Sequence, residues 1–265
     1  MTHTPVEPLQ WQADGSPFSP RFGDVYRSRS GALAQARQVF AGGCDLPQAW
    51  HKRSCFAVLE TGFGLGLNFL TTWALWRSDP ERCERLRFIS VEAHPADAPA
   101  LLRSAGLLRP ATPSAPAGVP IPDTADTDLA LCIERLAPAL AQAWSRRQLG
   151  WQRWHFEDDR VELCLGVGDA HTLLSALPAQ AVDAIYLDGF SPAKNPAMWS
   201  PALLSAVARH AVVGTRLASY TASSAVRRDL TALGFDVAKV PGLPPKRESL
   251  RAHMTARGRG PMGLD

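Results

Sequence analysis

The stretch Leu59–Asn68, which reads LETGFGLGLN, places three alternating glycines between two apolar runs. The run before it, Phe56–Leu59, is typical of a buried strand, and the run after it, Leu67–Trp73, is compatible with a helix. A strand, a glycine turn and a helix in that order form the first unit of a nucleotide- or nucleoside-binding α/β domain. Glycine suits such a turn because the backbone visits angles closed to other residues and because a ligand must approach the main chain closely.

The spacing of these glycines separates two classes of ligand. A dinucleotide fingerprint reads G-x-G-x-x-G and seats a pyrophosphate on the helix N-terminus, whereas Gly62, Gly64 and Gly66 follow the pattern G-x-G-x-G. Glu60 precedes them, and a carboxylate near the site favours the cationic methionyl end of S-adenosylmethionine. The motif predicts a donor site that includes Glu60, the three glycines and Asn68, with a purely structural glycine turn as the alternative.

The length and composition of the chain indicate which class of protein it belongs to. Its 265 residues, 46% hydrophobic and 20% charged, suit one large α/β domain with decorations, or two small ones. No run approaches the roughly 18 apolar residues of a membrane span, and the first residues lack the pattern of a signal peptide. Five scattered cysteines without a C-x-x-C pair predict reduced thiols in the cytoplasm, and the histidines show no ligand spacing, so no metal site is expected.

Strand-like and helix-like runs alternate along most of the chain, which predicts a mostly parallel sheet. We expect strands at 56–59, 86–91, 160–165, 182–187, 215–220, 235–240 and 248–251, and helices at 31–40, 67–76, 96–108, 129–147, 171–177, 201–211 and 223–233. The predicted organisation is an N-terminal extension over 1–54 packed on the core, a catalytic domain over 55–252 and a tail or linker stub over 253–265. Residues 109–128, rich in Pro, Ala, Thr and Asp, predict a flexible insertion within the domain.

Four carboxylates lie where predicted strands end, namely Glu60, Glu92, Asp169 and Asp188. Ligands of open α/β sheets bind at the carboxyl ends of the strands, so the four together favour a nucleoside pocket. We expect Glu92 to accept hydrogen bonds from ribose hydroxyls and Asp169 to meet an adenine amino group. A turn or a helix cap is the alternative for any one of these residues.

A second informative segment is Asp188–Trp199, which reads DGFSPAKNPAMW and follows the most apolar predicted strand. Its acid, glycine, prolines, lysine and aromatic residues predict a stiff wall that holds a flat substrate near a transferable methyl group. The alternative is an ordinary proline-rich connection between a strand and a helix. Trp199 by itself is interpreted as core packing or as the start of a helix.

Several segments resemble one family, the methyltransferase half of the bifunctional MnmC proteins, which act in 5-methylaminomethyl-2-thiouridine synthesis in tRNA. The resemblance rests on residues 59–70, 187–199 and 246–252, and FGDVY at 22–26 and YTASSAVRR at 220–228 are also similar. It implies a Rossmann-like class I S-adenosylmethionine-dependent methyltransferase with an N-terminal extension. The implied reaction is methylation of the 5-aminomethyl group of the wobble uridine.

The other half of these bifunctional proteins is a flavin oxidase. The resemblance therefore implies that this chain binds no FAD and that a separate or fused oxidase is its partner. The chain is then either a standalone, MnmD-like methyltransferase or a fragment of a bifunctional protein. Asp188 is the predicted catalytic residue, as an orienting group for the acceptor amine or as a general base.

The anticodon stem-loop of tRNA is the predicted macromolecular substrate. Candidate phosphate contacts are Lys194, Arg227, Arg228, Lys246 and Arg247. Candidate stacking partners of the uracil are Tyr26, Phe190 and Tyr220.

Three other functions stay open on the sequence. The first is a methyltransferase for a small-molecule or protein amine, and the second is an oxidoreductase that uses a nicotinamide dinucleotide, which the glycine spacing disfavours. The third is a non-catalytic RNA-binding module that kept the fold. The presence of Asp188 and of the three glycines argues against this third function.

Overall fold

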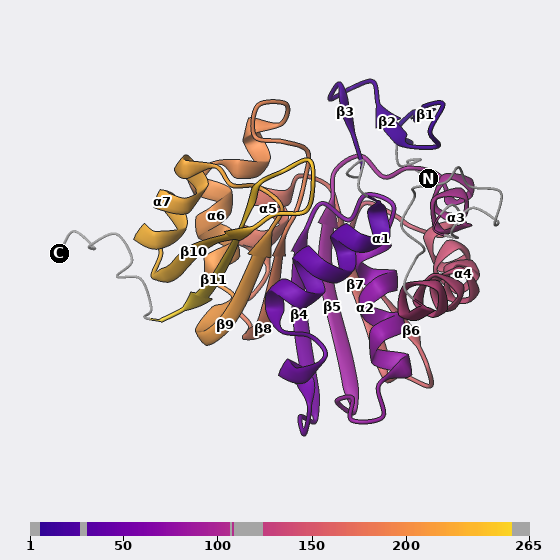
Figure 1. The fold of residues 1–265 in the computed structure, drawn as a ribbon, viewed down its shortest axis with the longest axis horizontal. Helices are drawn as coiled ribbons and strands as arrows, with labels where there is room; N and C mark the ends of the chain where they lie inside the picture. Colours follow the sequence, from indigo (N-terminus) through magenta and orange to yellow (C-terminus); the bar gives the residue numbers. More distant parts are fainter. Residues whose placement is uncertain (1–5, 27–30, 107, 109–123, 256–265) are drawn as a thin grey trace.

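The central feature of the computed structural model is an eight-stranded sheet with the strand order β10-β11-β9-β8-β4-β5-β7-β6 (Figure 1). The structure describes residues 6–26, 31–106, 108 and 124–255. The strands are β4 Cys55–Thr61, β5 Arg85–Glu92, β6 Gly150–Phe156, β7 Val161–Val167, β8 Val182–Leu187, β9 Ala211–Ser219, β10 Phe235–Pro241 and β11 Glu248–Met254.

The directions of the strands make this a doubly wound sheet. The pairs of β4 with β5 and β8, of β5 with β7 and of β8 with β9 are parallel, whereas β6 and β11 run antiparallel to their neighbours. The chain leaves β4 toward β5 on one side and later fills β8 on the other side, so the strand order reverses at β4. In such sheets the ligand crevice lies at the carboxyl ends of the strands beside the reversal, here β4, β5 and β8.

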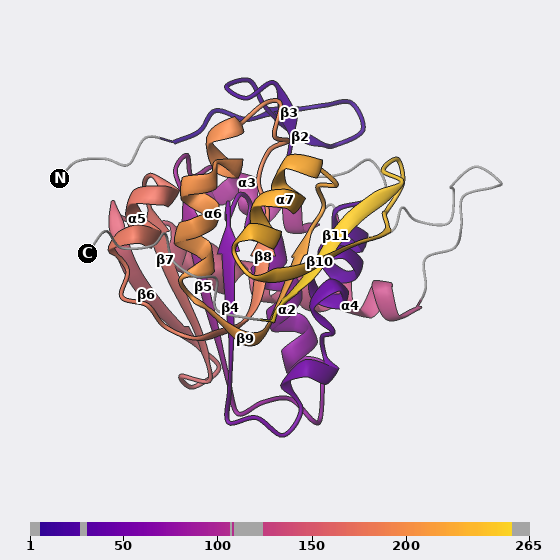
Figure 2. The ribbon, with the colours of Figure 1, turned by 90° about the vertical axis from the view of Figure 1, so that its left-hand side faces the viewer.

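Helices cover both faces of the sheet. The helices are α1 Ala32–Ala34, α2 Leu67–Ser78, α3 Ala98–Gly106, α4 Thr124–Trp144, α5 Ala170–Ala176, α6 Pro201–Ala208 and α7 Ser224–Ala232, and a π-helix, η1, spans Gln35–Ala41. Figures 1 and 2 show α5, α6 and α7 on one side of the sheet and α1, α2 and α4 on the other. No described helix is long and apolar enough to cross a membrane.

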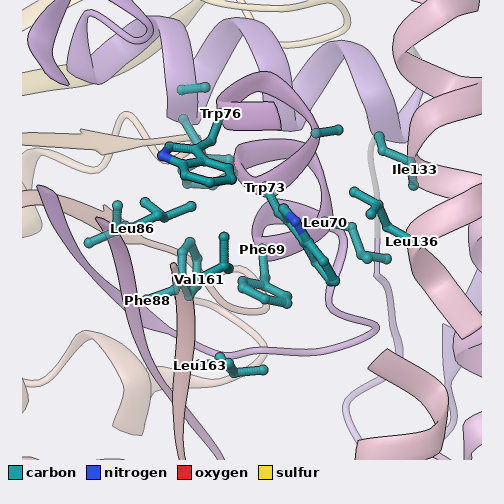
Figure 3. Packing of buried hydrophobic residues seen from close by; sticks show 14 of the residues in the cluster. Phe69, Leu70, Trp73, Trp76, Leu86, Phe88, Ile133, Leu136, Val161 and Leu163 are labelled. Carbon is teal, nitrogen blue, oxygen red and sulfur yellow. The ribbon is translucent and has the colours of Figure 1, made fainter. Parts of the chain in front are cut away.

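The alternation of side chains along β4 explains why both faces are covered. Phe56 and Val58 join the core cluster that α2 and α4 complete, whereas Ala57 and Leu59 join the cluster beneath α5, α6 and α7. A strand with apolar residues on both faces requires helices on both sides. Figure 3 shows the first cluster, where Phe69 and Trp73 of α2 lie between the sheet and α4, and the rings of Phe69 and Phe88 are 5.3 Å apart.

The N-terminal segment forms a small sheet of its own and also supplies core residues. Strands β1 Gln10–Trp11, β2 Pro17–Ser19 and β3 Asp24–Val25 pair antiparallel, and Figures 1 and 2 show them at one end of the main sheet. The buried Glu7 carboxylate anchors this sheet by accepting hydrogen bonds from Ser19 Oγ at 2.7 Å and Arg21 Nε at 2.9 Å. Leu65 and Ala96 pack against Tyr26, which ties the small sheet to the glycine turn.

The structure differs from the predicted elements in several places. The edge strand β6 and the three N-terminal strands were not predicted from the sequence. Helix α4 begins at Thr124, inside the stretch expected as an insertion, and β11 continues to Met254, inside the expected tail. The rest of those two predictions, residues 109–123 and 256–265, lies outside the described residues.

Candidate active site

A cavity of about 640 Å³ lies at the carboxyl ends of β4, β5 and β8, beneath the small N-terminal sheet. Its volume is in the usual range for a small-molecule site, about 300 to 1,000 Å³. Its lining includes Val91, Glu92 and Ala170, and also Asp188, Tyr220 and Lys246. The glycine turn and the Asp188 segment both reach this cavity, although they lie more than a hundred residues apart in the sequence.

The glycine turn connects β4 to α2 with Gly62, Gly64 and Gly66 at φ angles of 76°, 56° and 73°. A Cβ atom on Gly62 would lie 3.4 Å from the Asp188 carbonyl oxygen, and one on Gly64 would lie 3.3 Å from the Tyr26 ring. Both of these glycines line the cavity. A Cβ atom on Gly66 would instead meet Phe63 at 2.9 Å, so this glycine permits packing beneath the turn and does not line the cavity.

Glu92, the last residue of β5, lines the cavity and also holds the turn in place. Its Oε2 atom accepts a hydrogen bond from the Gly64 amide at 2.7 Å, and its Oε1 atom accepts one from the His94 amide at 2.8 Å. Burial raises the pKa of this carboxyl, and the two amide donors oppose that rise. Glu92 is thus positioned by the backbone of two loops before any ligand binds.

Asp188 follows β8 directly and lines the same cavity. Its Oδ2 atom accepts a hydrogen bond from Asn68 Nδ2 at 2.9 Å, and its Oδ1 atom accepts one from the Gly189 amide at 2.8 Å. Thr61 Oγ1 donates to the Asp188 carbonyl oxygen at 2.7 Å, which joins the ends of β4 and β8. Burial raises the pKa of Asp188 to about 6 against these donors and the charge of Lys246, so the carboxyl is ionised at neutral pH.

Glu60 lies beneath the cavity and does not line it. Glu60 is 1% exposed, and its Oε2 atom accepts a hydrogen bond from Ser90 Oγ at 2.6 Å. Its Oε1 atom has no hydrogen-bond partner among the described residues. Burial, together with the charges of Asp188 and Glu92, raises the pKa of Glu60 to about 8.

Asp169 caps helix α5 and is not among the residues that line the cavity. Its Oδ1 atom accepts hydrogen bonds from the Thr172 amide at 2.8 Å and from Thr172 Oγ1 at 2.6 Å. These donors lower the pKa of Asp169, because they favour the ionised form. The arrangement is the helix cap that stood as the alternative for this residue.

Aromatic side chains from two segments form one wall of the cavity. The Phe190 ring stacks on Phe22 at 4.7 Å and meets the edge of Tyr26 at 4.9 Å. The Phe190 carbonyl accepts a hydrogen bond from Trp199 Nε1 at 2.8 Å, so the buried Trp199 fixes the loop that carries Phe190. This wall joins the N-terminal sheet to the segment after β8.

The predicted substrate contacts fall into two groups. Tyr26, Phe190, Tyr220 and Lys246 line the cavity. Exposed side chains outside it are Lys194, Arg227, Arg228 and Arg247. The two arginines of α7 and Arg247 therefore offer charge on the outer surface, whereas Lys246 carries its charge inside.

Several residues that line the cavity were not predicted as site residues. Phe22 and Asp24 come from the N-terminal sheet, and the Asp24 carboxylate accepts a hydrogen bond from the Ser191 amide at 3.1 Å. His94 and Met198 also line it. Phe22 and Asp24 belong to the FGDVY segment and Met198 to the segment Asp188–Trp199, both of which are informative in the sequence, whereas His94 lies in neither.

Comparisons with known proteins agree with this architecture. The family described as S-adenosyl-L-methionine-dependent methyltransferase matches residues 133–255. A solved structure, MNMC2 from Aquifex aeolicus, shares the fold with a TM-score of 0.66 and 24% sequence identity, over 98% of this chain and 73% of that one. The sheet order and the helices on both faces therefore confirm the predicted class I methyltransferase fold.

Sequence relatives narrow the family further. The tRNA 5-methylaminomethyl-2-thiouridine biosynthesis bifunctional protein MnmC of Acidovorax sp. (strain JS42) is 46% identical over 95% of this chain and 36% of its own length. The protein of the same name from Ralstonia nicotianae is 48% identical over 90% of this chain and 33% of its own length. The chain spans about a third of these curated relatives. It belongs to the family of S-adenosyl-L-methionine-dependent methyltransferases that forms one part of the bifunctional MnmC proteins.

Proposed function

We propose that the protein methylates the 5-aminomethyl nitrogen of the wobble uridine, or 2-thiouridine, of tRNA with S-adenosylmethionine as donor. The observation that carries this proposal is that one cavity joins the glycine turn to Asp188 and to an aromatic wall. The donor class agrees with the family, and the acceptor agrees with the name of the MnmC relatives, which specifies 5-methylaminomethyl-2-thiouridine in tRNA. A cytoplasmic location and an oxidase partner, separate or fused, are part of the proposal.

The residues around the turn fit a nucleoside with a charged amino-acid end. When bound, S-adenosylmethionine supplies a methyl group on a positively charged sulfur. Glu92 offers a half-buried carboxylate beside the apolar Val91, as a ribose with a neighbouring adenine requires. Gly62, Gly64 and Asn68 also line the cavity, where the two glycines leave room and Asn68 offers a polar side chain. We do not extend the donor site to Gly66, Glu60 or Asp169, because none of them lines the cavity.

Asp188 is proposed to bind the acceptor amine and point its lone pair toward the methyl group. An alkyl amine has a pKa of ~10, and transfer of its proton to a carboxyl whose pKa is about 6 is uphill by about 5 kcal/mol. Orientation by an ionised carboxylate avoids that cost, and alignment of reacting atoms is a large source of rate acceleration. We therefore assign Asp188 the role of orienting the acceptor amine. General-base action is the less favoured alternative, because the proton transfer is uphill.

Three aromatic side chains that line the cavity are proposed to receive the uracil ring. Tyr26, Phe190 and Tyr220 reach the cavity from three separate segments, and splayed bases in RNA loops commonly stack on such side chains. Burial raises the pKa of Tyr26, so its hydroxyl stays protonated and can donate a hydrogen bond to a base carbonyl.

Exposed cations outside the cavity are proposed to contact the phosphates of the anticodon stem-loop. They are Lys194, Arg227, Arg228 and Arg247. Their charge suits a phosphate backbone, and it predicts that tRNA affinity falls as salt rises.

The deciding experiment incubates the protein with labelled S-adenosylmethionine and with tRNA from cells that lack this methylation. Digestion and nucleoside analysis should find the label in 5-methylaminomethyl-2-thiouridine. Parallel reactions contain a small-molecule amine or a lysine-rich protein in place of tRNA. Label in one of these acceptors, with none in tRNA, would replace the proposed substrate by another amine while keeping the methyltransferase chemistry.

A further inference from the structure

Lys246 lines the cavity, whereas the other four predicted phosphate contacts are exposed outside it. Its Nζ atom donates a hydrogen bond to the Tyr220 carbonyl oxygen at 3.1 Å and lies 4.0 Å from the centre of the Tyr220 ring. Among the described residues that line the cavity, Lys246 is the only lysine or arginine. Arg247, the next residue, is exposed and lies outside the cavity.

The turn between β10 and β11 fixes this orientation. The Lys246 amide donates to the Leu243 carbonyl at 3.0 Å, and the Gly242 amide donates to the Arg247 carbonyl at 2.9 Å. A Cβ atom on Gly242 would lie 2.8 Å from the Lys246 carbonyl oxygen, so the turn is tightly closed. The Tyr220 hydroxyl donates to the Leu243 carbonyl at 3.3 Å, which binds the turn to the end of β9.

Apart from Lys246, the ionisable groups around Asp188 are mostly acids. Glu92 from β5 lies on one side, together with Glu60 from β4, whose raised pKa of about 8 keeps it mostly protonated at neutral pH, and Asp24 from β3 lies near Lys246. Lys246 opposes the effect of burial on Asp188, and in turn Asp188 and Asp24 oppose the effect of burial on the ammonium, whose pKa is lowered. Tyr26 adds no charge at neutral pH, because burial raises the pKa of its hydroxyl. Lys246 therefore places a positive charge inside a cavity that, by the proposed function, receives an alkyl amine that is protonated in bulk water.

We propose that Lys246 is a positioning residue for the methyl acceptor, acting through Asp188 and through the charge of the cavity. Its ammonium keeps Asp188 ionised and disfavours the protonated form of an amine bound beside that carboxylate. The inference rests on the proposed function. The acceptor then releases one proton to bulk water as it enters and binds as the free amine, with an N–H group donated to Asp188. Its lone pair forms the N–C bond, and the electron pair of the breaking C–S bond stays on sulfur.

The repulsion also acts after the methyl transfer. The product nitrogen is a secondary ammonium until it loses a proton, and the positive charge of Lys246 disfavours that ion in the cavity. Lys246 is thus expected to favour the neutral amine before the transfer and the departure of the product afterwards. A phosphate contact on the outer surface would have neither effect.

The test compares Lys246→Met with Lys246→Arg and with Arg247→Met. Single-turnover methylation of tRNA is measured from pH 5.5 to pH 9 at saturating donor. In Lys246→Met the acidic limb of the profile should move up by on the order of one pH unit, with a rate roughly ten-fold lower at pH 7, because nearby charges shift a pKa by about one to three units. Lys246→Arg should retain most of the wild-type rate at pH 7 and most of the wild-type position of the acidic limb. Arg247→Met should weaken tRNA binding and leave the limb in place.

An unmoved limb in Lys246→Met, with tRNA affinity lowered as in Arg247→Met, would overturn the proposal and return Lys246 to the phosphate contacts. Carboxyl carbon NMR of the ligand-free protein separates this result from a failure of the proposed function. The Asp188 midpoint should rise in Lys246→Met and stay constant in Arg247→Met, whatever the acceptor is. An unchanged Asp188 midpoint in a folded Lys246→Met variant would also overturn the proposal.

Discussion

The substitution Glu60→Gln tests whether the buried carboxyl beneath the cavity carries a proton. Glu60 is 1% exposed, its Oε2 atom accepts a hydrogen bond from Ser90, and its Oε1 atom has no partner among the described residues. A glutamine keeps the shape of the neutral acid and removes its titration. If Glu60 is neutral in the folded protein, the variant should fold to the same structure and lose one contribution to the pH dependence of stability.

The sign and size of that contribution follow from the raised pKa of Glu60, about 8 in the folded protein against 4.5 for the free side chain. Between these values the unfolded chain has released the proton and the folded protein still holds it. The stability contributed by Glu60 is therefore complete below pH 4.5 and is lost as the pH rises to 8. The loss approaches about 1.4 kcal/mol per pH unit, which amounts to about 2 kcal/mol between pH 6 and pH 8.

Urea unfolding followed by tryptophan fluorescence at pH 6, 7 and 8 measures this difference. The free energy of unfolding of Glu60→Gln, minus that of the wild type, should rise by about 2 kcal/mol across this range. Other titrating groups, including Asp188, cancel in the difference to the extent that they titrate alike in both proteins. Glu84→Gln is the matched control, because it makes the same substitution at an exposed position. A Glu60→Gln difference as flat as that of Glu84→Gln would refute the protonated state.

Four further variants separate binding, catalysis and folding. Asp188→Asn should lower single-turnover methylation by about 10²-fold or more while calorimetry finds donor binding retained, and normal methylation would remove Asp188 from the mechanism. Asp169→Ala should lower the free energy of unfolding by about 1 kcal/mol through loss of the cap. Its donor affinity should stay constant, and a ten-fold loss in calorimetry would restore an adenosine contact. Gly66→Ala should destabilise by about 1 to 3 kcal/mol in urea unfolding, because its Cβ atom would lie 2.9 Å from Phe63. Arg227→Ala combined with Arg228→Ala should reduce the salt dependence of tRNA affinity by about one to two units of slope, and an unchanged slope would exclude both as phosphate contacts.

Local signals predicted the elements that carry the proposed donor site. The glycines at 62, 64 and 66 adopt the positive φ angles that the motif requires, and the apolar runs on either side became β4 and α2. The fold follows from such units because alternating strands and helices allow few arrangements of a parallel sheet. Edge strand β6 was not predicted, because the sequence from Gly150 to Phe156 shows no clear alternation of apolar and polar residues. Most of its residues are half-buried in the structure.

Long-range contacts determined the parts of the site that could not be predicted. The orientation of Lys246 depends on Tyr220, 26 residues earlier in the chain, and on the closed turn that begins at Gly242. The N-terminal strands are two or three residues long, and their place above the cavity depends on Glu7 and Arg21. Such contacts leave no periodic pattern in the sequence. A positive charge near the C-terminus therefore suggested phosphate contacts equally for Lys246 and Arg247.

Strand register explains why carboxylates that look equivalent in the sequence differ in the structure. Thr61 is level with both Val91 and Leu187, so Glu92 and Asp188 lie at the same height, one residue beyond this level. Glu60 is level with Ser90 and Tyr186, two residues below Glu92 and Asp188 on the same face. Two residues correspond to about 6.6 Å along a strand, enough to move a carboxyl from the lining of the cavity to its buried floor. A difference of two residues in position along the strands therefore decides whether an acid is available to a ligand or is kept neutral by burial.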